Sequence, residues 1–276
     1  MTKILDGKVV AQSIRDRLKG EIKSLPYVPH LCVIQLGKDD EGSNLYVKFK
    51  KKAAEEIGMK SSTYELPINT SQEDLIVHID KLNKDPEVDG ILVQMPLPKQ
   101  INTWEIIKQL DPQKDVDGFH PINNWALDNK LTGLFPCTPR GIISLLEYYK
   151  YSFEGKHVVI VNRSHLVGNP LLKLFRKYNA TVTQCHSKTK NLAQVAKTAD
   201  ILVVATGNPS LVTEEWVTDK SIVIDVSSPK GDCHDHFDAI KNKVEAITPV
   251  PGGIGPMTIA CLLENTVQAA KERRKK

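Results

Sequence analysis

Short apolar runs that alternate with helix-length segments constrain the fold of this 276-residue chain more than any other feature. In the first half, the pattern predicts strands and helices over 7–23, 31–36, 44–57, 61–66, 72–83 and 89–94. In the second half, it predicts them over 139–150, 157–161, 180–185, 200–205, 221–226, 244–247 and 257–273. This alternation is typical of βαβ units on a parallel sheet, so we expect an α/β protein.

A chain of this length suggests two domains or one large α/β domain. Residues 95–139 show neither the helical nor the strand repeat of apolar residues and are rich in Pro, Asn and Asp, so we expect them to be irregular. Long stretches of this kind inside compact domains are often functional. A helix over 139–150 then opens a second cycle of strands, which places the domain boundary near residue 140.

The formal net charge of +4 lies in the last six residues, which carry five basic side chains and one acidic one. Proteins that bind nucleic acid usually have a basic face, so we expect a solvated helix end and no nucleic-acid partner. The five cysteines are far apart and form no CxxC pair, which favours reduced thiols and a cytoplasmic protein. No apolar run reaches about 18 residues and no signal peptide is recognisable, so no membrane association is expected.

Lys50 stands on the side of the predicted helix 44–57 that should face the core. It falls within the apolar arc of the helical wheel, one turn after Tyr46 and on the same face. A lysine in this position either extends its ammonium group to solvent or is held in a cleft. In a cleft, burial lowers the pKa of a lysine and lets it take part in acid–base chemistry. Both interpretations are open from the sequence.

Polar residues follow the last strand of the first half. Gln94 ends the strand over 89–94, where ligands bind in open α/β sheets, although a glutamine bonded only to its own turn would look the same. Asp115 and Asp117 precede Gly118. An Asp-Gly turn explains one of these acids but not both, and a single carboxylate suits an N–H-rich heterocycle. The further oxygens of a calcium loop are absent, so no metal site is expected.

The segment that follows the strand over 157–161 stands at the place of a dinucleotide-binding loop. Asn162 and Ser164 occupy the first two glycine positions of the fingerprint, and Gly168 comes one residue late. The match is weak, although Asn tolerates the left-handed conformation of a tight turn.

Residues 185–190 lie where an NAD-dependent enzyme would place an acid against the ribose 2′-hydroxyl, and they contain none. Their hydroxyl and lysine side chains, together with Arg163, suit a 2′-phosphate and favour NADP, unless the segment is a generic polar loop. Three glycines over 252–255 permit a close approach of the backbone to a ligand.

These motifs together resemble the bifunctional methylenetetrahydrofolate dehydrogenase/methenyltetrahydrofolate cyclohydrolase family across nearly the whole chain. The matching segments stand in the family's order and are residues 43–53, 88–98, 114–121, 136–139, 163–168, 185–189 and 248–258. The resemblance implies a two-domain α/β fold with the active-site cleft between the domains. Residues 1–140 would form a folate-binding catalytic domain joined by the C-terminal helix 257–276, and residues 141–256 a Rossmann-like NADP-binding domain.

The resemblance also implies residue roles. Lys50 would be the catalytic lysine, and Gln94 would hydrogen-bond it and tune its protonation. Tyr46 would stack on the folate, and Asp117 would bind the N–H edge of the pterin ring. The cofactor-binding set would be Asn162, Arg163, Ser164, Ser187 and Ser228. The loop that lines the folate site would contain Pro251, Gly252 and Gly253.

The implied activity, in one-carbon metabolism and purine biosynthesis, has two steps. Hydride leaves the methylene carbon of 5,10-methylenetetrahydrofolate for NADP, and water then opens the methenyl product to 10-formyltetrahydrofolate. A positioned lysine would manage the proton transfers, an effect typically worth about 10²–10⁴-fold in rate. The family further implies a cytoplasmic homodimer that acts on folates with or without a polyglutamate tail.

The departures from the family pattern leave the folate-side residues intact. Asn162 stands where the family commonly has Gly, and Trp125 replaces another Gly. Ser227, Ser228 and Pro229 replace the usual Gly-Ile-Asn that lines the nicotinamide site. Two alternatives therefore stay open: a cyclohydrolase with a weakened or NAD-dependent dehydrogenase, and a non-catalytic folate- or nucleotide-binding regulator.

Overall fold

The computed structural model describes residues 2–37, 41–129 and 131–275. The chain divides into two compact units, one of Met1–Ala11 with Thr138–Thr258 and the other of Gln12–Cys137 with Ile259–Lys276. The divisions fall inside the first helix, inside the last helix, and near the boundary expected at residue 140. The first residues of the chain therefore group with its second half, which the sequence did not suggest.

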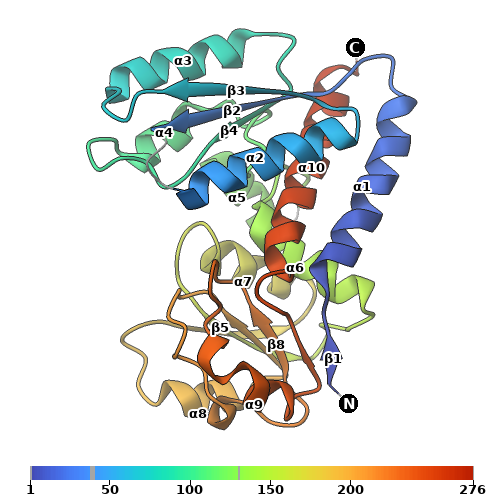
Figure 1. The fold of residues 1–276 in the computed structure, drawn as a ribbon, viewed down its shortest axis with the longest axis vertical. Helices are drawn as coiled ribbons and strands as arrows, with labels where there is room; N and C mark the ends of the chain where they lie inside the picture. Colours follow the sequence, from blue (N-terminus) through green and yellow to red (C-terminus); the bar gives the residue numbers. More distant parts are fainter. Residues whose placement is uncertain (1, 38–40, 130, 276) are drawn as a thin grey trace. The chain divides into compact units, whose positions relative to one another are not determined.

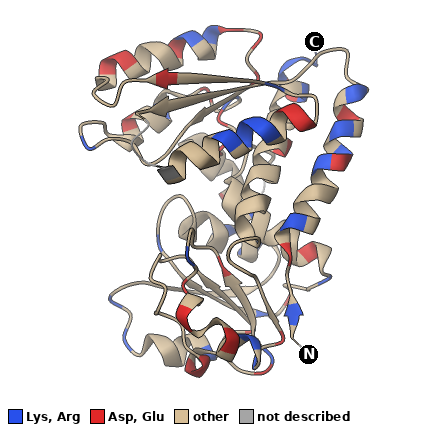
Figure 2. Cartoon of the chain, in the orientation of Figure 1, with Lys and Arg blue, Asp and Glu red and all other residues tan. Residues whose placement is uncertain are grey.

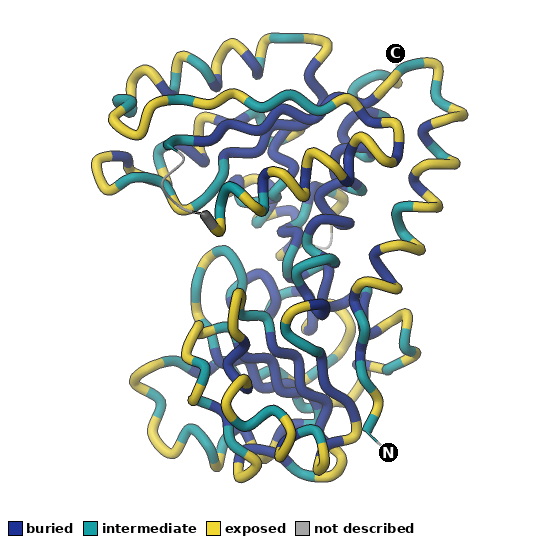
Figure 3. The backbone as a smooth tube through the Cα atoms, viewed as in Figure 1, coloured by how far each residue is buried: buried dark blue, intermediate teal, exposed yellow. Residues whose placement is uncertain are grey.

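The unit that contains Lys50 is built on a three-stranded parallel sheet of order β3-β2-β4. Its strands are β2 (His30–Leu36), β3 (Lys60–Leu66) and β4 (Gly90–Val93). The central strand pairs Leu31 with Gly90 on one side and with Ser61 on the other. Most residues of β2 and all of β4 are buried, as their continuous Val, Ile and Leu runs predict for a parallel sheet covered on both faces (Figure 3).

The helices of this unit are α1 (Gly7–Lys23) from residue 12 onward, α2 (Glu41–Glu56), α3 (Gln72–Lys84), α4 (Thr103–Gln109), α5 (Pro121–Asp128) and α10 (Ile254–Arg273) from residue 259 onward (Figure 1). The expectation that residues 95–139 are irregular was wrong for α4 and α5. Both helices are too short to show a period but have clear caps. Asn102 accepts the backbone N–H groups of Trp104 and Glu105, and the ring of His120 accepts that of Ile122.

The other unit is built on a six-stranded parallel sheet of order β1-β9-β8-β7-β5-β6. Its strands are β1 (Lys3–Ile4), β5 (His157–Val161), β6 (Thr181–Cys185), β7 (Ile201–Val204), β8 (Ile222–Asp225) and β9 (Ala246–Ile247). Its helices are α6 (Cys137–Tyr148), α7 (Gly168–Lys177), α8 (Leu192–Lys197) and α9 (Phe237–Lys241), with short 3₁₀ turns at Glu214–Trp216 and His234–His236. Strand β6 lies on one side of β5 and β7 on the other, so the direction in which successive strands are added reverses at β5. Open α/β sheets bind ligands at such a switch point.

Each unit has its own apolar core. In the Lys50 unit, residues of α10 that include Cys261, Leu262 and Val267 pack with Leu31 and Leu92 of the sheet. In the other unit, buried residues of the parallel strands pack with α8 and α9, and Ile4 of β1 adds to them. All five cysteines are buried, and none of them is joined in a disulfide. Among the described residues, we find no helix that is both long and apolar enough to cross a bilayer.

The sequence predicts that the basic tail is a solvated helix end, but in the structure part of the tail is bound to the protein. Arg273 and Arg274 donate hydrogen bonds to the carboxylate of Asp89, which is fully buried. The Arg274 guanidinium also lies 4.8 Å from the centre of the Tyr27 ring, within the range of a cation–π contact. Two of the five basic side chains therefore hold the end of α10 against the start of β4.

Candidate active site

Lys50 is buried, with 6% of its surface exposed. Its Nζ donates a hydrogen bond of 2.9 Å to Oε1 of Gln94, the residue that follows β4. The amide nitrogen of Gln94 in turn donates to the carbonyl of Met95 at 2.7 Å, so the amide oxygen is the atom that faces the lysine. The structure thus decides between the two interpretations of Lys50: its ammonium group does not extend to solvent.

The two acids of the following loop have separate surroundings. Asp115 is fully buried and accepts N–H groups from Gly118, His120 and Asn123 at 2.7–3.2 Å, which fixes the turn. Burial raises the pKa of Asp115 to about 7. Burial also raises the pKa of Asp117, and the nearby charge of Lys50 opposes that rise. Asp115 is therefore the structural acid, whereas the carboxylate of Asp117 lies within the electrostatic influence of Lys50.

The loop that carries Asp117 is held in place by backbone and side-chain contacts. Ile91 of β4 donates its N–H to the carbonyl of Lys114 at 2.7 Å, so the segment runs alongside the strand. Gly118 has a φ of +77°, and a Cβ there would lie 2.4 Å from a backbone carbon of Phe135. Only glycine fits this turn, which sets the direction in which Asp117 leaves the strand.

Tyr46 lies one helical turn before Lys50 on α2 and is half-buried. Leu45 and Phe49 beside it are 50% and 48% exposed, although Phe49 belongs to the same apolar arc of the wheel. An aromatic ring and apolar side chains therefore flank the buried lysine. Such a surface suits a flat aromatic ligand.

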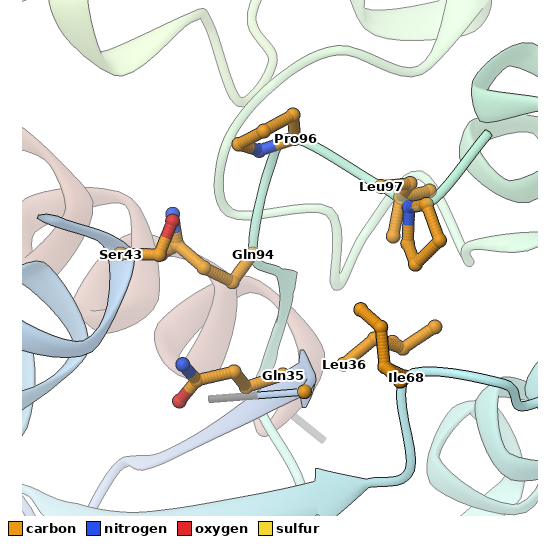
Figure 4. A pocket seen from close by; sticks show the side chains of 9 residues that line it. Gln35, Leu36, Ser43, Ile68, Gln94, Pro96 and Leu97 are labelled. Atoms are coloured by element: carbon orange, nitrogen blue, oxygen red, sulfur yellow. The ribbon is translucent and has the colours of Figure 1, made fainter. Parts of the chain in front are cut away.

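A pocket of about 440 Å³ lies against Gln94, within the size range of small-molecule sites. Gln35 and Ser43 form its polar side together with Gln94 (Figure 4). The opposite side is apolar and includes Ile68 and Leu97. The pocket therefore combines a few polar groups with an apolar wall, which is the composition of ligand sites.

In the other unit, the side chain of Asn162 organises the loop between β5 and α7. Its amide oxygen accepts the N–H groups of Ser164 and Gly168 at 2.8 and 3.0 Å. Its amide nitrogen donates to the carbonyl of Ala205 after β7 at 2.6 Å. A Cβ on Gly168 would lie 2.2 Å from the carbonyl oxygen of Asn162, so the helix starts against the loop only with glycine. Asn162 thus closes the turn that glycines form in the usual fingerprint.

The remaining candidates for cofactor binding differ in exposure. Arg163 and Ser187 are exposed after β5 and β6, and Ser164 is half-buried with its Oγ accepting the N–H of Val167. Because β5 and β6 are adjacent parallel strands, Arg163 and Ser187 lie at the same edge of the sheet. Ser228 is exposed after β8. Basic and hydroxyl side chains without an acid therefore follow β5 and β6, which fits a 2′-phosphate.

The loop of Pro251, Gly252 and Gly253 belongs to this second unit, not to the unit of Lys50. Gly252 has a φ of +114°, which requires glycine, and its carbonyl accepts the N–H of Gly7 at 2.9 Å. The structure therefore brings Tyr46, Lys50, Gln94 and Asp117 into one unit and this loop, with the cofactor candidates, into the other. The predicted cleft between the domains stays a prediction.

Sequence reasoning missed one polar residue of the pocket, Gln35, and one buried lysine elsewhere in this unit, Lys114. Gln35 lines the pocket and donates to the side chain of Asn44 at 2.6 Å. It lies near the carboxyl end of β2, so the rule that selected Gln94 would also have selected it. Lys114 is fully buried and donates to three carbonyls, of Leu82, Asn83 and Asp85. No periodicity marks Lys114, because it lies outside any helix or strand.

A six-stranded parallel sheet that turns back beside such a loop is the architecture of the nucleotide-binding half of two-domain α/β oxidoreductases. The lysine site occupies a separate α/β unit, as in enzymes that bind substrate and nucleotide on different domains. The chain belongs to the tetrahydrofolate dehydrogenase/cyclohydrolase family. Residues 5–117 match its catalytic domain, and residues 136–274 match its NAD(P)-binding domain. The predicted family and the two-domain α/β fold class are confirmed.

Relatives of the chain match over its whole length. The bifunctional protein FolD of Lachnoclostridium phytofermentans is 48% identical over 280 residues, which cover 99% of each chain. The crystal structure of the bifunctional FolD enzyme, methylenetetrahydrofolate dehydrogenase/cyclohydrolase, from Campylobacter jejuni is 44% identical with a TM-score of 0.94, covering 99% of this chain and 100% of that one. The Trypanosoma brucei enzyme, solved in complex with NADP cofactor and inhibitor, is 34% identical with a TM-score of 0.92, and 98% of each chain is covered.

Proposed function

We propose that this protein oxidises 5,10-methylenetetrahydrofolate with NADP and hydrolyses the resulting methenyltetrahydrofolate to 10-formyltetrahydrofolate. The observation that carries the proposal is the buried Lys50, whose Nζ is hydrogen-bonded to Gln94. The charge of Lys50 also acts on the carboxylate of Asp117. A buried amine with a fixed neutral acceptor and a nearby carboxylate is suited to moving protons on a bound ligand. The bifunctional relatives at 44–48% identity support the same pair of reactions.

Substrate binding rests on the residues around Lys50. The exposed face of Tyr46 offers a stacking surface for an aromatic ring, and the carboxylate of Asp117 accepts hydrogen bonds from the N–H edge of a pterin. Pro251, Gly252 and Gly253 are proposed to line the folate site through their backbone. These contacts would orient the carbon between N5 and N10.

NADP supplies the hydride acceptor of the first step when it is bound. The loop residues Asn162, Arg163 and Ser164 are proposed to hold it, with Ser187 and Ser228. Arg163 and Ser187 lie at one edge of the sheet, and their segments 162–167 and 185–190 contain no acid, which favours a dinucleotide that carries a 2′-phosphate. The NADP complex of the 34% identical T. brucei enzyme supports this choice of cofactor.

In the hydrolytic step, water attacks the methenyl carbon and the bond from that carbon to N5 breaks. Lys50 is placed to take one proton of the attacking water and pass it to N5. The second proton of that water leaves to solvent as the formyl carbonyl forms, which balances the positive charge of the methenyl substrate. Gln94 holds Nζ by accepting one of its hydrogens, since its own amide nitrogen is fixed on Met95. Gln94 is therefore proposed to favour the orientation in which the lysine lone pair or proton faces the substrate.

A two-reaction assay tests the proposal. Purified protein should reduce NADP with methylenetetrahydrofolate and hydrolyse methenyltetrahydrofolate, and failure of both reactions would refute it. Lys50→Met should lower hydrolysis by about 10²–10⁴-fold without loss of the fold, the usual contribution of a positioned acid–base group. Lys81→Met is the matched control, because Lys81 is an exposed lysine on another helix of the same unit, α3. Normal hydrolysis by Lys50→Met would rule out the role of Lys50.

A second candidate is a cyclohydrolase with a weakened or NAD-dependent dehydrogenase. The replacement of Gly-Ile-Asn by Ser227, Ser228 and Pro229 favours it, since the departure lies after β8 in the nucleotide-binding unit. Turnover with NAD compared with NADP separates the two candidates. A non-catalytic regulator would bind folate or nucleotide without turnover, and the Lys50–Gln94 pair argues against it.

We further propose a cytoplasmic homodimer. Strand β3 lies at the edge of its sheet and pairs only with β2 within the described part of the chain. Such an edge offers backbone groups to a second copy, and Tyr64 on it is 39% exposed. Light scattering should give twice the chain mass, and Tyr64→Lys should shift the protein toward the monomer. A monomeric wild type would refute this part.

The substrate is proposed to include polyglutamylated folates. Lys48, Lys51 and Lys52 are exposed on the polar face of α2, the helix that also carries Tyr46 and Lys50 (Figure 2). Glu55 and Glu56 lie on this face too, within 4.0 Å of Lys51 and Lys52. Carboxylates of a glutamate tail would be attracted to this face. A polyglutamate substrate should therefore have a lower KM than the monoglutamate, and the difference should shrink at high salt. Equal KM values would contradict the proposal.

A further inference from the structure

The hydroxyl group of Ser227 lies between two loops at the carboxyl edge of the second sheet. Ser227 follows β8, and its Oγ donates to the carboxylate of Asp232. The same Oγ accepts the N–H of Gly207, which follows β7, at 3.0 Å. A single side chain therefore joins the loop after β7 to the loop after β8.

Asp232 is the common acceptor of both loops. It is fully buried, and it accepts the N–H groups of Thr206 and Asn208 at 2.9 Å each, as well as the Thr206 hydroxyl. Its own N–H donates to Asp225 at the end of β8 at 3.0 Å. A buried carboxylate needs such donors, because leaving it without them would be costly. Ser227 supplies a donor from the loop that follows β8.

This arrangement continues into the dinucleotide-binding loop. Ala205, the residue before Thr206, accepts the side-chain amide of Asn162 at 2.6 Å. The loops after β5, β7 and β8 are thus joined by Asn162, Asp232 and Ser227 within one unit. These are the loops beside the switch point of the sheet, where a dinucleotide binds in this architecture.

We propose that Ser227 is a positioning residue for dinucleotide binding. Its hydroxyl fixes the loop after β7 against the loop after β8 before the cofactor arrives, which lowers the ordering cost of binding. A glycine at this position would offer no hydroxyl and could not make this connection. The hydroxyl of Ser227 is therefore a fixed contact between two loops of the nucleotide-binding unit. The inference rests on the proposed NADP-dependent function.

Three substitutions at Ser227 test the proposal. Ser227→Gly and Ser227→Ala remove the hydroxyl, whereas Ser227→Thr keeps it. Ser210→Ala is the matched control, because the Ser210 hydroxyl also donates to an aspartate, Asp235, but on an exposed segment of the same unit. The measurements are the Kd of NADP by calorimetry, KM and kcat of the dehydrogenase, and hydrolysis of methenyltetrahydrofolate.

Ser227→Gly and Ser227→Ala should raise the Kd and the KM for NADP by about 3- to 10-fold, the range expected for one lost hydrogen bond. Values of kcat should stay within about twofold, and hydrolysis should not change. Ser227→Thr should restore the wild-type Kd, and Ser210→Ala should keep it. In the ligand-free protein, hydrogen exchange at Gly207 should be faster in Ser227→Gly, because its N–H loses its acceptor.

Unchanged Kd values in Ser227→Gly and Ser227→Ala would overturn the inference while the proposed function stands. An equal loss of hydrolysis in these variants would also overturn it, since it would indicate general damage. A wild type that binds NADP without reducing it would refute the proposed function, and the Kd series would still decide the role of Ser227. A wild type that binds no dinucleotide would refute both.

Discussion

Replacing Lys114 with Met should change how the stability of the Lys50 unit depends on pH. Lys114 is fully buried, and its ammonium group donates to the carbonyls of Leu82, Asn83 and Asp85 at 2.7–2.8 Å. These carbonyls end helix α3 and begin the turn that follows it. Burial, aided by the charge of Arg273, lowers the pKa of Lys114 from 10.5 to about 8.

The sign of the effect follows from this lowered pKa. Between pH 8 and 10.5 the unfolded chain binds more protons than the folded one, so the free energy of unfolding rises with pH in that window. The full difference corresponds to about 3 kcal/mol, of which roughly 1 kcal/mol should appear between pH 7 and 9. Lys114→Met lacks this contribution. It should also lose about 2–4 kcal/mol at pH 7, because three buried carbonyls are left without donors.

Urea unfolding followed by tryptophan fluorescence measures both effects, since Trp104 and Trp125 lie in this unit. The wild type should gain stability relative to Lys114→Met from pH 7 to pH 9. Lys108→Met is the control, because Lys108 is exposed and pairs with Glu105. It should follow the pH dependence of the wild type. Parallel curves for the wild type and Lys114→Met would refute the buried-amine argument.

Three further predictions concern the proposed sites. Burial raises the pKa of Asp117 and Lys50 opposes that rise, so on acidification folate binding should begin to weaken at a higher pH than an ordinary aspartate would give. In pH profiles of the folate Kd, Lys50→Met should move this loss of binding to higher pH, and Asp117→Asn should remove it. Arg163→Ala should raise the KM for NADP by about 10- to 100-fold and that for NAD little, and equal effects in steady-state kinetics would contradict a 2′-phosphate contact. Gly168→Ala should destabilise the protein by about 2–4 kcal/mol in thermal unfolding, because its Cβ would lie 2.2 Å from Asn162.

The sequence predicted the alternation of strands and helices well because the inner strands of both parallel sheets are buried and therefore appear as continuous apolar runs. The wheel of α2 and the end of β4 then singled out Lys50 and Gln94 as candidates, and in the structure these residues are bonded. The roles of these residues come from the family resemblance and await the assays.

Other features depend on contacts that no local pattern contains. The separation of Asp115 from Asp117 follows from which carboxylate meets the N–H groups of Gly118 and His120. Asn162 looked like a weak fingerprint in the sequence, yet its amide bonds close the loop. Strand β1, of two residues, has no period at all and forms only because β9 offers an edge.

The division of the chain has a consequence for folding during synthesis. Residues 12–137 need Cys261, Leu262 and Val267 of α10 for their core, and those residues are made after the whole second sheet. Strands β2, β3 and β4 are therefore synthesised before the α10 residues that complete their core. The later unit in turn includes β1, the first strand of the chain, whose residues Lys3 and Ile4 pair with β9. Neither half is a module that could be cut out at residue 140 and expected to fold unaided.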